Sequence, residues 1–143
     1  MKVDEKRLMV ALRLAAKGRR VWVQRVENIV VDGTPDVLLI APCGRHVWVE
    51  LKVATRPKRA TTPVLGARGM RQEQINWHEK AALMCVETYI LIRDDEAELY
   101  LIPGELAGSV NKMPLAELQC NSVIRGKGSE FWKMFFDDLE EEC

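Results

Sequence analysis

The sequence lacks any segment that would place the chain in a membrane or a secretory pathway. No stretch approaches the roughly 18 consecutive apolar residues that a membrane-spanning helix needs. The N-terminal segment, residues 1–10, also lacks the basic region and following apolar run of a signal peptide. A soluble cytoplasmic protein is therefore expected.

Cysteine is scarce and scattered, which argues against a zinc site. The chain has no Cys-x-x-Cys pair and no Cys/His spacing that suits zinc. The four cysteines are Cys43, Cys85, Cys120 and Cys143. They are expected to be free thiols, either in the core or incidental. Internal repeats are absent as well, and 143 residues with 48% hydrophobic side chains fit one domain.

The chain also lacks a net charge: 21 basic residues balance 21 acidic ones, so the formal charge is zero. This balance argues against a nucleic-acid binder, but the charges are unevenly distributed. Segment 130–143 holds six acids and one lysine, so the remainder holds 20 basic and 15 acidic residues, a net charge of +5. Seven basic residues and two acids lie from Lys52 to Lys80, a patch that would attract phosphates. A solvated loop without a partner explains that patch equally well on charge alone.

Hydrophobic periodicity predicts a succession of helices and strands. Helices are expected where apolar residues recur every three or four positions: 4–17, 71–84 and 130–139. Strands are expected where apolar or β-branched residues alternate or run together: 20–31, 36–41, 46–53, 86–92 and 98–102. Strands 36–41 and 46–53 should pair as a hairpin, since only a short turn joins them.

The remaining segments are expected to be short helices, turns and one long loop. Segment 54–69 is rich in Pro, Gly, Thr and Arg, so a mobile, exposed loop is expected there, and long loops in domains are often functional. Short helical or turn segments are expected after Pro103 and at 115–118. Ser129 is expected to cap the last helix.

The informative segment is Gly33-Thr34-Pro35-Asp36, followed after thirteen residues by Glu50-Leu51-Lys52. Side chains at positions i and i+2 of a strand share a face, so Glu50 and Lys52 should emerge together. In a hairpin, the start of the first strand lies opposite the end of the second, which places Asp36 beside them. One hairpin thus gathers two carboxylates and a lysine.

Two carboxylates and a lysine at a strand edge suit phosphodiester hydrolysis. Asp36 and Glu50 supply hard oxygen ligands, which Mg²⁺ binds at about 2.1 Å while it keeps several waters. Such a metal acidifies a bound water and offsets charge on the phosphorane oxygens. Lys52 can orient or deprotonate the attacking water, or stabilise the developing charge. The alternative is a surface ion pair between Glu50 and Lys52, with Asp36 merely in a turn.

These residues resemble the signature of the PD-(D/E)XK nuclease superfamily. Within it, the sequence is most similar to the small virus-type replication-repair (VRR-NUC) nucleases and the Holliday-junction-resolvase-like branch. The resemblance implies that Asp36 and Glu50 bind the metal together with the backbone carbonyl of Leu51. It also implies that Lys52 is the catalytic lysine of the motif.

The resemblance extends to the helices on either side of the hairpin. The family's first helix often contributes an acid, for which Glu5 is the candidate and Asp4 a weaker one, although a helix N-terminus favours acids in any case. Gln74 matches the glutamine of an Arg-x-x-Gln-x-x-Trp-like stretch, and it can hydrogen-bond a metal-bound water or a phosphate oxygen. Trp77 is more often a core residue than a base-stacking platform. His78 is more often structural than part of a cleft.

The fold and activity follow from the resemblance as expectations. They are an α/β fold with a restriction-endonuclease-like core, in which helices flank a mixed central β-sheet. A single nuclease-like domain is expected over 1–143, with its core at 4–102 and a C-terminal helix and acidic tail at 129–143. The implied activity is Mg²⁺- or Mn²⁺-dependent endonucleolytic cleavage of branched, flapped or junction DNA by a phage-like homodimer in the host cytoplasm.

Several basic residues are expected to hold the DNA backbone. They are Arg56, Lys58, Arg59, Arg68 and Arg71. Two other functions remain open: a non-catalytic nucleic-acid-binding module, and a structural or regulatory interaction protein that uses the acidic tail 137–142 as its contact. The tail is alternatively a DNA mimic that covers the basic patch. The residues alone do not distinguish DNA from RNA, or endonucleolytic from exonucleolytic cleavage.

Overall fold

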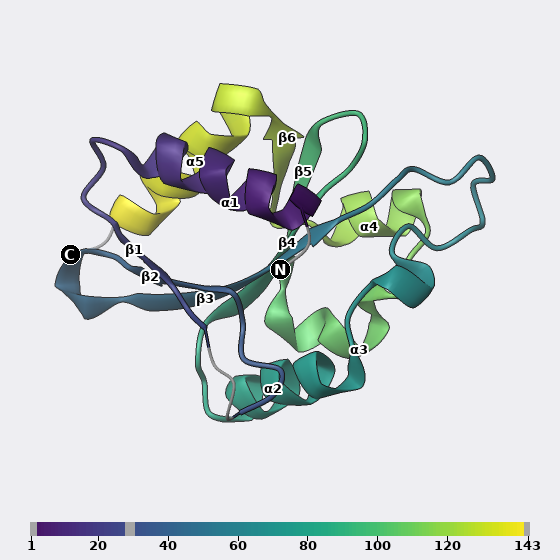
Figure 1. Cartoon of the computed structure of the whole chain (residues 1–143), viewed down its shortest axis with the longest axis horizontal. Coiled ribbons are helices and arrows are strands. Elements are labelled where there is room, and N and C mark those ends of the chain that lie inside the picture. Colours follow the sequence, from purple (N-terminus) through teal and green to yellow (C-terminus); the bar gives the residue numbers. More distant parts are fainter. Residues whose placement is uncertain (1–2, 28–30, 142–143) are drawn as a thin grey trace.

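A six-stranded mixed sheet forms the centre of the molecule in the computed structural model, which describes residues 3–27 and 31–141 (Figure 1). The strands are β1 (Trp22–Arg25), β2 (Val37–Ile40), β3 (His46–Val53), β4 (Thr88–Arg93), β5 (Glu98–Pro103) and β6 (Ile124–Lys127). They lie side by side in the order of the sequence, and neighbours pair antiparallel except for β3 and β4. The parallel pair requires a crossover connection, which contains helix α2 (Gln72–Leu83).

Helices cover both faces of the sheet (Figure 1). Helices α1 (Val3–Ala16) and α5 (Gly128–Glu140) lie on one face, and α2, α3 (Ala107–Val110) and α4 (Leu115–Asn121) lie on the other. Each layer has its own apolar core: Val49 and Leu51 of β3 pack in the core beneath α1 and α5, whereas Ile90 and Ile92 of β4 pack toward α3 and α4. Because side chains alternate along a strand, Glu50 and Lys52 of β3 face the α2 layer.

Most of the expected elements are present. The helices expected at 4–17 and 71–84 are α1 and α2, and the expected hairpin is the β2–β3 pair. Segment 20–31 forms only the short strand β1, and its residues 28–30 lie outside the described residues. The segment after Pro103 and segment 115–118 are helical, as expected.

Two local expectations are wrong. Strand β6 was not expected, because its four residues include Gly126 and two basic residues and so lack an apolar run. It pairs with β5 at the sheet edge, where Leu99 lies opposite Gly126. Ser129 does not cap the last helix, since α5 already begins at Gly128 and no side chain makes a cap hydrogen bond there.

The segment 54–69 is held to the domain more firmly than its composition indicates. Val64 and Leu65 are buried in the core beneath α3, and the amide of Val64 donates to the carbonyl of Met113 at 3.0 Å. The Asn111 side chain also bridges the backbone of Met70, accepting from its amide at 2.7 Å and donating to its carbonyl at 2.8 Å. The expectation of a mobile, exposed loop is therefore wrong for its second half, while residues 58–63 are exposed.

The cysteines do not all remain thiols. Cys43, in the turn before β3, is disulfide-bonded, so the expectation of four free thiols is wrong for this residue. Cys85 and Cys120 are free and exposed within the described part of the chain, and Cys143 lies outside it. None of the helices in residues 3–27 and 31–141 is long and apolar enough to cross a membrane.

Candidate active site

The β2–β3 hairpin brings the two predicted carboxylates together. Val37 lies opposite Val49, so Asp36, the residue before β2, lies opposite Glu50. The Oδ2 atom of Asp36 accepts a hydrogen bond from the amide of Leu51 at 2.9 Å. The spacing of the motif therefore predicts the register of the hairpin correctly, and the Asp36 carboxylate is fixed against the backbone of β3.

A tight turn before β2 sets the position of Asp36. Gly33 adopts φ +88°, a conformation that favours glycine, and a Cβ at this position would overlap the backbone carbonyl of Glu73. The amide of Gly33 donates to the Asp32 carboxylate at 3.0 Å, and Pro35 is buried. The turn thus packs against the first turn of α2, which joins the hairpin and the helix at the site.

Glu50 is buried among charged and polar groups. Its side chain is only 2% exposed, and its Oε1 atom accepts a hydrogen bond from Gln74 Nε2 at 2.7 Å and lies 3.8 Å from Lys52 Nζ. Its Oε2 atom is buried without a hydrogen-bond partner among the described residues. Lys52 is buried as well, so the alternative of a surface ion pair does not describe these two residues.

The surroundings of Glu50 disfavour its negative charge. Burial raises the pKa of Glu50 well above its ordinary value, the negative charge of Asp36 raises it further, and the charge of Lys52 lowers it in part. The charge of Glu5 raises the pKa of Glu50 as well. Glu5, in the first turn of α1, is itself 8% exposed. The structure therefore brings the predicted acids Asp36 and Glu5 within electrostatic reach of Glu50.

Gln74 is held at both ends of its amide. Its Oε1 atom accepts from the amide of Arg71 at 2.9 Å, so its Nε2 atom is the group that donates to Glu50. The predicted partner of Gln74 was a metal-bound water or a phosphate oxygen, but the structure places its side chain on the Glu50 carboxylate. Gln74 thus positions an acid of the site.

The donor set fits a hard divalent cation. Within the described ranges no three His, Cys, Asp or Glu side chains are grouped closely enough to hold a metal ion by themselves. Mg²⁺ usually takes only one or two carboxylates and keeps several waters, and Asp36 and Glu50 are such a pair. The unpartnered, buried Oε2 of Glu50 and the repulsion between the two acids would both be relieved by a cation. The predicted ligands Asp36, Glu50 and the carbonyl of Leu51 are therefore compatible with Mg²⁺ or Mn²⁺.

Arg56 has a set of acidic partners within the protein. Its guanidinium lies 2.7 Å from Asp94, 2.7 Å from Glu96 and 2.6 Å from Glu98. Burial pushes the pKa of Asp94 upward, but hydrogen bonds from Tyr100, Arg56 and two backbone amides outweigh burial and lower it. Arg56 thus fastens the start of segment 54–69 to the turn between β4 and β5, and its charge is already matched.

The other predicted DNA-binding residues are exposed. Lys58 and Arg59 lie at the tip of segment 54–69, and Arg71 lies at the start of α2, 3.5 Å from Asp32. Arg68 lines a polar cleft of about 640 Å³ beside Val53, at the end of β3. Arg7 and Arg93 line the same cleft, with Asp4, Asp94 and Asp95.

Sequence reasoning missed Arg7 and Arg93. Arg93 could have been identified from its position at the end of a predicted strand. In the structure it pairs with Val53, the residue after Lys52. Arg7 lies two residues after Glu5 in α1, and only the packing of α1 against β3 shows that it reaches the cleft.

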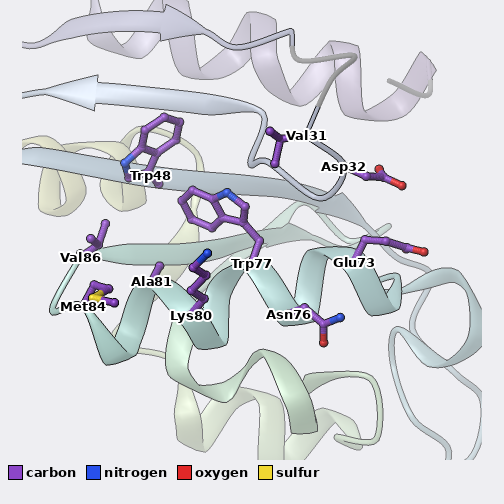
Figure 2. A pocket seen from close by; sticks show the side chains of 10 residues that line it. All are labelled: Val31, Asp32, Trp48, Glu73, Asn76, Trp77, Lys80, Ala81, Met84 and Val86. Atoms are coloured by element: carbon purple, nitrogen blue, oxygen red, sulfur yellow. The ribbon is translucent and has the colours of Figure 1, made fainter.

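The two aromatic candidates of α2 have different surroundings. His78 is fully buried, its Nδ1 lies 2.8 Å from Thr88 Oγ1, and burial lowers its pKa to about 4, so it has a structural role. Trp77 is half-buried and lies against Trp48, with ring centroids 5.3 Å apart. Together they line a second pocket of about 540 Å³ (Figure 2). Trp48 was missed, although it stands two residues before Glu50 on the same strand.

The acidic end of the chain pairs with arginines far from segment 54–69. Asp137 of α5 lies 2.9 Å from Arg19, and Asp138 lies 3.3 Å from Arg45. Glu140 also lies 3.4 Å from Arg19. These contacts fasten α5 to the end of α1 and to the turn before β3, whereas residues 142 and 143 lie outside the described residues.

Comparison with known proteins supports the fold. The sequence matches no protein-family model and no curated protein. Among solved structures, the chain is similar to Hjc, a Holliday junction resolvase from the archaeal hyperthermophile Archaeoglobus fulgidus, with a TM-score of 0.55 and 17% sequence identity. The match covers 94% of this chain and 100% of that chain. The expected α/β fold, in which helices flank a mixed central sheet, is thus confirmed, and the chain shares this fold with that resolvase.

Proposed function

We propose that the protein is a divalent-metal-dependent nuclease that hydrolyses phosphodiester bonds in DNA, with a preference for branched or junction structures. The observation that carries the proposal is the buried Glu50 carboxylate beside Asp36 and Lys52, one oxygen of which has no hydrogen-bond partner in residues 3–27 and 31–141. A structural role alone would not explain two acids held together where their charges repel. Placement within the VRR-NUC branch is part of the same proposal.

The residues of the site have separate tasks in this reaction. Bound Mg²⁺ or Mn²⁺, held by Asp36, Glu50 and the carbonyl of Leu51, would acidify water and offset negative charge on the phosphate. Asp36 is oriented by the amide of Leu51, and Glu50 by Gln74, so neither carboxylate has to be ordered when substrate arrives. Lys52 brings a positive charge to the same point, where it can orient the attacking water or stabilise charge that develops on the phosphate.

The DNA backbone is proposed to run along the polar cleft at the end of β3. Arg7, Arg68 and Arg93 line this cleft, next to the strand that carries Glu50 and Lys52. The cleft also contains Asp4, Asp94 and Asp95, so the excess of positive charge comes from Lys58 and Arg59 in the exposed part of segment 54–69. Backbone contacts of this kind give affinity without sequence specificity, which suits an enzyme that recognises the shape of DNA.

Two considerations support a branched substrate. The similar solved structure is named as a Holliday junction resolvase. A symmetric homodimer of this chain would present two sites to the two strands of a four-way junction that are related by symmetry. Cleavage of junction DNA and dimerisation of the chain are therefore the first properties to test.

The test is cleavage of labelled substrates in Mg²⁺ or Mn²⁺: a four-way junction, a flap, a single strand, a plain duplex and RNA. Wild type is compared with Asp36→Asn and Lys52→Ala, and with Glu117→Gln, an exposed acid of α4 that lies outside the hairpin and the polar cleft, as the matched control. The proposal predicts cleavage by wild type and the control and none by the two site variants. Binding of DNA without cleavage in either metal would favour the non-catalytic binding module instead.

A further inference from the structure

The strand that carries the candidate site also carries an aromatic residue on the same face. Trp48, Glu50 and Lys52 alternate along β3, so their side chains share one face and Trp48 precedes Glu50 by about 6.6–6.8 Å along the strand. Helix α2 runs over this face: Gln74 contacts Glu50, and Trp77, three residues later, contacts Trp48. The same strand and helix thus build the acid site and an aromatic pocket next to it.

The pocket is open, apolar and lined by two indole rings. Figure 2 shows the Trp48 and Trp77 rings next to one another between β3 and α2. The planes of the two rings are inclined at 59°. Met84 and Val86 continue the apolar wall and are 69% and 38% exposed. A concave apolar surface lined by aromatic side chains is typical of ligand pockets.

Polar groups stand at the rim of the pocket. Asn76 and Lys80 of α2 are both exposed and line it, as do the exposed acids Asp32 and Glu73 (Figure 2). Asn76 accepts from Gln72 through Oδ1 at 2.8 Å, so its amide nitrogen is the group that it can offer to a ligand. An apolar, aromatic floor with hydrogen-bond donors and acceptors at its edge suits a flat heterocycle that has ring nitrogens, amino groups and carbonyls.

We propose that this pocket binds an unpaired nucleobase of the nucleotide next to the cleaved phosphate. The proposal rests on the nuclease function above and names its substrate more closely. An extended nucleotide can place its phosphate at Glu50 and Lys52 and its base against Trp48 and Trp77. Stacking on indole rings accepts any base, and Asn76 and Lys80 can donate to the base edge or to the next phosphate.

A substrate preference follows from this placement. In a continuous duplex the base must leave its stack before it can enter the pocket, and this unstacking costs free energy. At a flap or a junction the base at the branch point is already partly unstacked. The pocket would therefore make the enzyme prefer unpaired nucleotides at the cut without reading their sequence.

The test combines one residue change with one change in the substrate. Wild type, Trp77→Leu and Trp77→Phe are assayed on a flap that carries either a normal base or an abasic site at the nucleotide next to the cut. Loss of one base–aromatic stack should reduce kcat/KM for the normal flap about five- to 150-fold in Trp77→Leu, and Trp77→Phe should retain most activity. The abasic flap should be cut equally slowly by all three proteins, because the base and the ring act as a pair.

A binding measurement separates this proposal from the nuclease function. A flap with the fluorescent base 2-aminopurine at the tested nucleotide, without divalent metal, should change its fluorescence on binding wild type and Trp22→Leu but not Trp77→Leu. Trp22 is an exposed tryptophan outside the pocket and serves as the matched control. This signal without cleavage would support the pocket and reject the nuclease function.

Other results would overturn the pocket assignment. Equal cleavage of the normal and abasic flaps by wild type would overturn the pocket assignment but not the nuclease function. Equal losses for Trp77→Leu on the normal and abasic flaps would also do so, since the ring would then act without the base. A wild-type dimer that Trp77→Leu converts to monomer in sedimentation would assign the pocket to a second copy of this chain.

Discussion

Gln74 Nε2 lies 2.7 Å from Glu50 Oε1, and this hydrogen bond connects helix α2 to the strand that carries the candidate site. The other end of the same amide accepts from the Arg71 backbone, so the donor is preorganised. A buried carboxylate with its charge disfavoured needs such a donor to keep one orientation. The contact therefore matters for the geometry of Glu50 before any substrate is present.

Replacing Gln74 should reduce activity through Glu50. Gln74→Leu removes the donor and keeps the size of the side chain, so we expect a 10- to 100-fold loss of cleavage, with a higher metal concentration needed for half-maximal rate. The matched control is Gln72→Leu, an exposed residue of the same helix that contacts only Asn76 among the described hydrogen bonds. Unchanged metal dependence in Gln74→Leu would show that Gln74 does not position a metal ligand.

Glu50→Gln should stabilise the metal-free protein. The pKa of Glu50 is raised in the folded state, so between 4.5 and that raised value the folded chain binds more protons than the unfolded chain. The free energy of unfolding of wild type therefore falls as pH rises through this window, and the neutral glutamine removes this loss. We expect a higher Tm for Glu50→Gln at pH 8, by about 2–4 °C for each kcal/mol relieved.

Mg²⁺ should reverse the order of the Tm values of wild type and Glu50→Gln. Binding to the folded state raises the Tm of wild type with increasing Mg²⁺, but Glu50→Gln, which has one carboxylate fewer, should respond weakly. Thermal unfolding at pH 5 and pH 8, with and without Mg²⁺, measures both effects. A Glu50→Gln variant less stable than wild type at pH 8 without metal would mean that the Glu50 charge is not a source of strain.

The pH dependence of cleavage should shift with the metal concentration. The Glu50 carboxyl must lose its proton to bind a cation, and its raised pKa delays this loss as pH increases. Cleavage should therefore rise with pH, and the midpoint of the rise should move to lower pH when Mg²⁺ is increased, because metal and proton compete for the same oxygens. A midpoint that stays fixed over a 100-fold range of Mg²⁺ would assign the titration to another group.

The central part of the site is predictable from sequence because it is local. Asp36, Glu50 and Lys52 belong to one hairpin, in which a two-residue alternation and a short turn fix which side chains meet. The outer parts depend on contacts between distant segments. Arg56 meets acids about 40 residues later in the chain, and Trp48 meets Trp77 only because α2 crosses β3. No local pattern indicates either contact.

Arg56 and Arg68 lie in the same segment, but Arg56 should contribute to the stability of the fold and Arg68 to DNA binding. Arg56→Ala leaves the buried Asp94 carboxylate without its guanidinium partner, so we expect a loss of about 3 kcal/mol in the free energy of unfolding. Arg68 is exposed in the polar cleft, so Arg68→Ala should leave stability within about 0.5 kcal/mol of wild type.

DNA binding should be weakened by Arg68→Ala and not by Arg56→Ala, the opposite of the expected effects on stability. Each phosphate contact releases counterions, so Arg68→Ala should weaken binding to all DNA structures and reduce the slope of log K against log salt by about 1. Arg56→Ala, measured below its unfolding temperature, should keep the wild-type slope. Urea unfolding and a salt titration of junction binding test both variants, and a reduced slope in Arg56→Ala would mean that its guanidinium leaves the acids to meet phosphate.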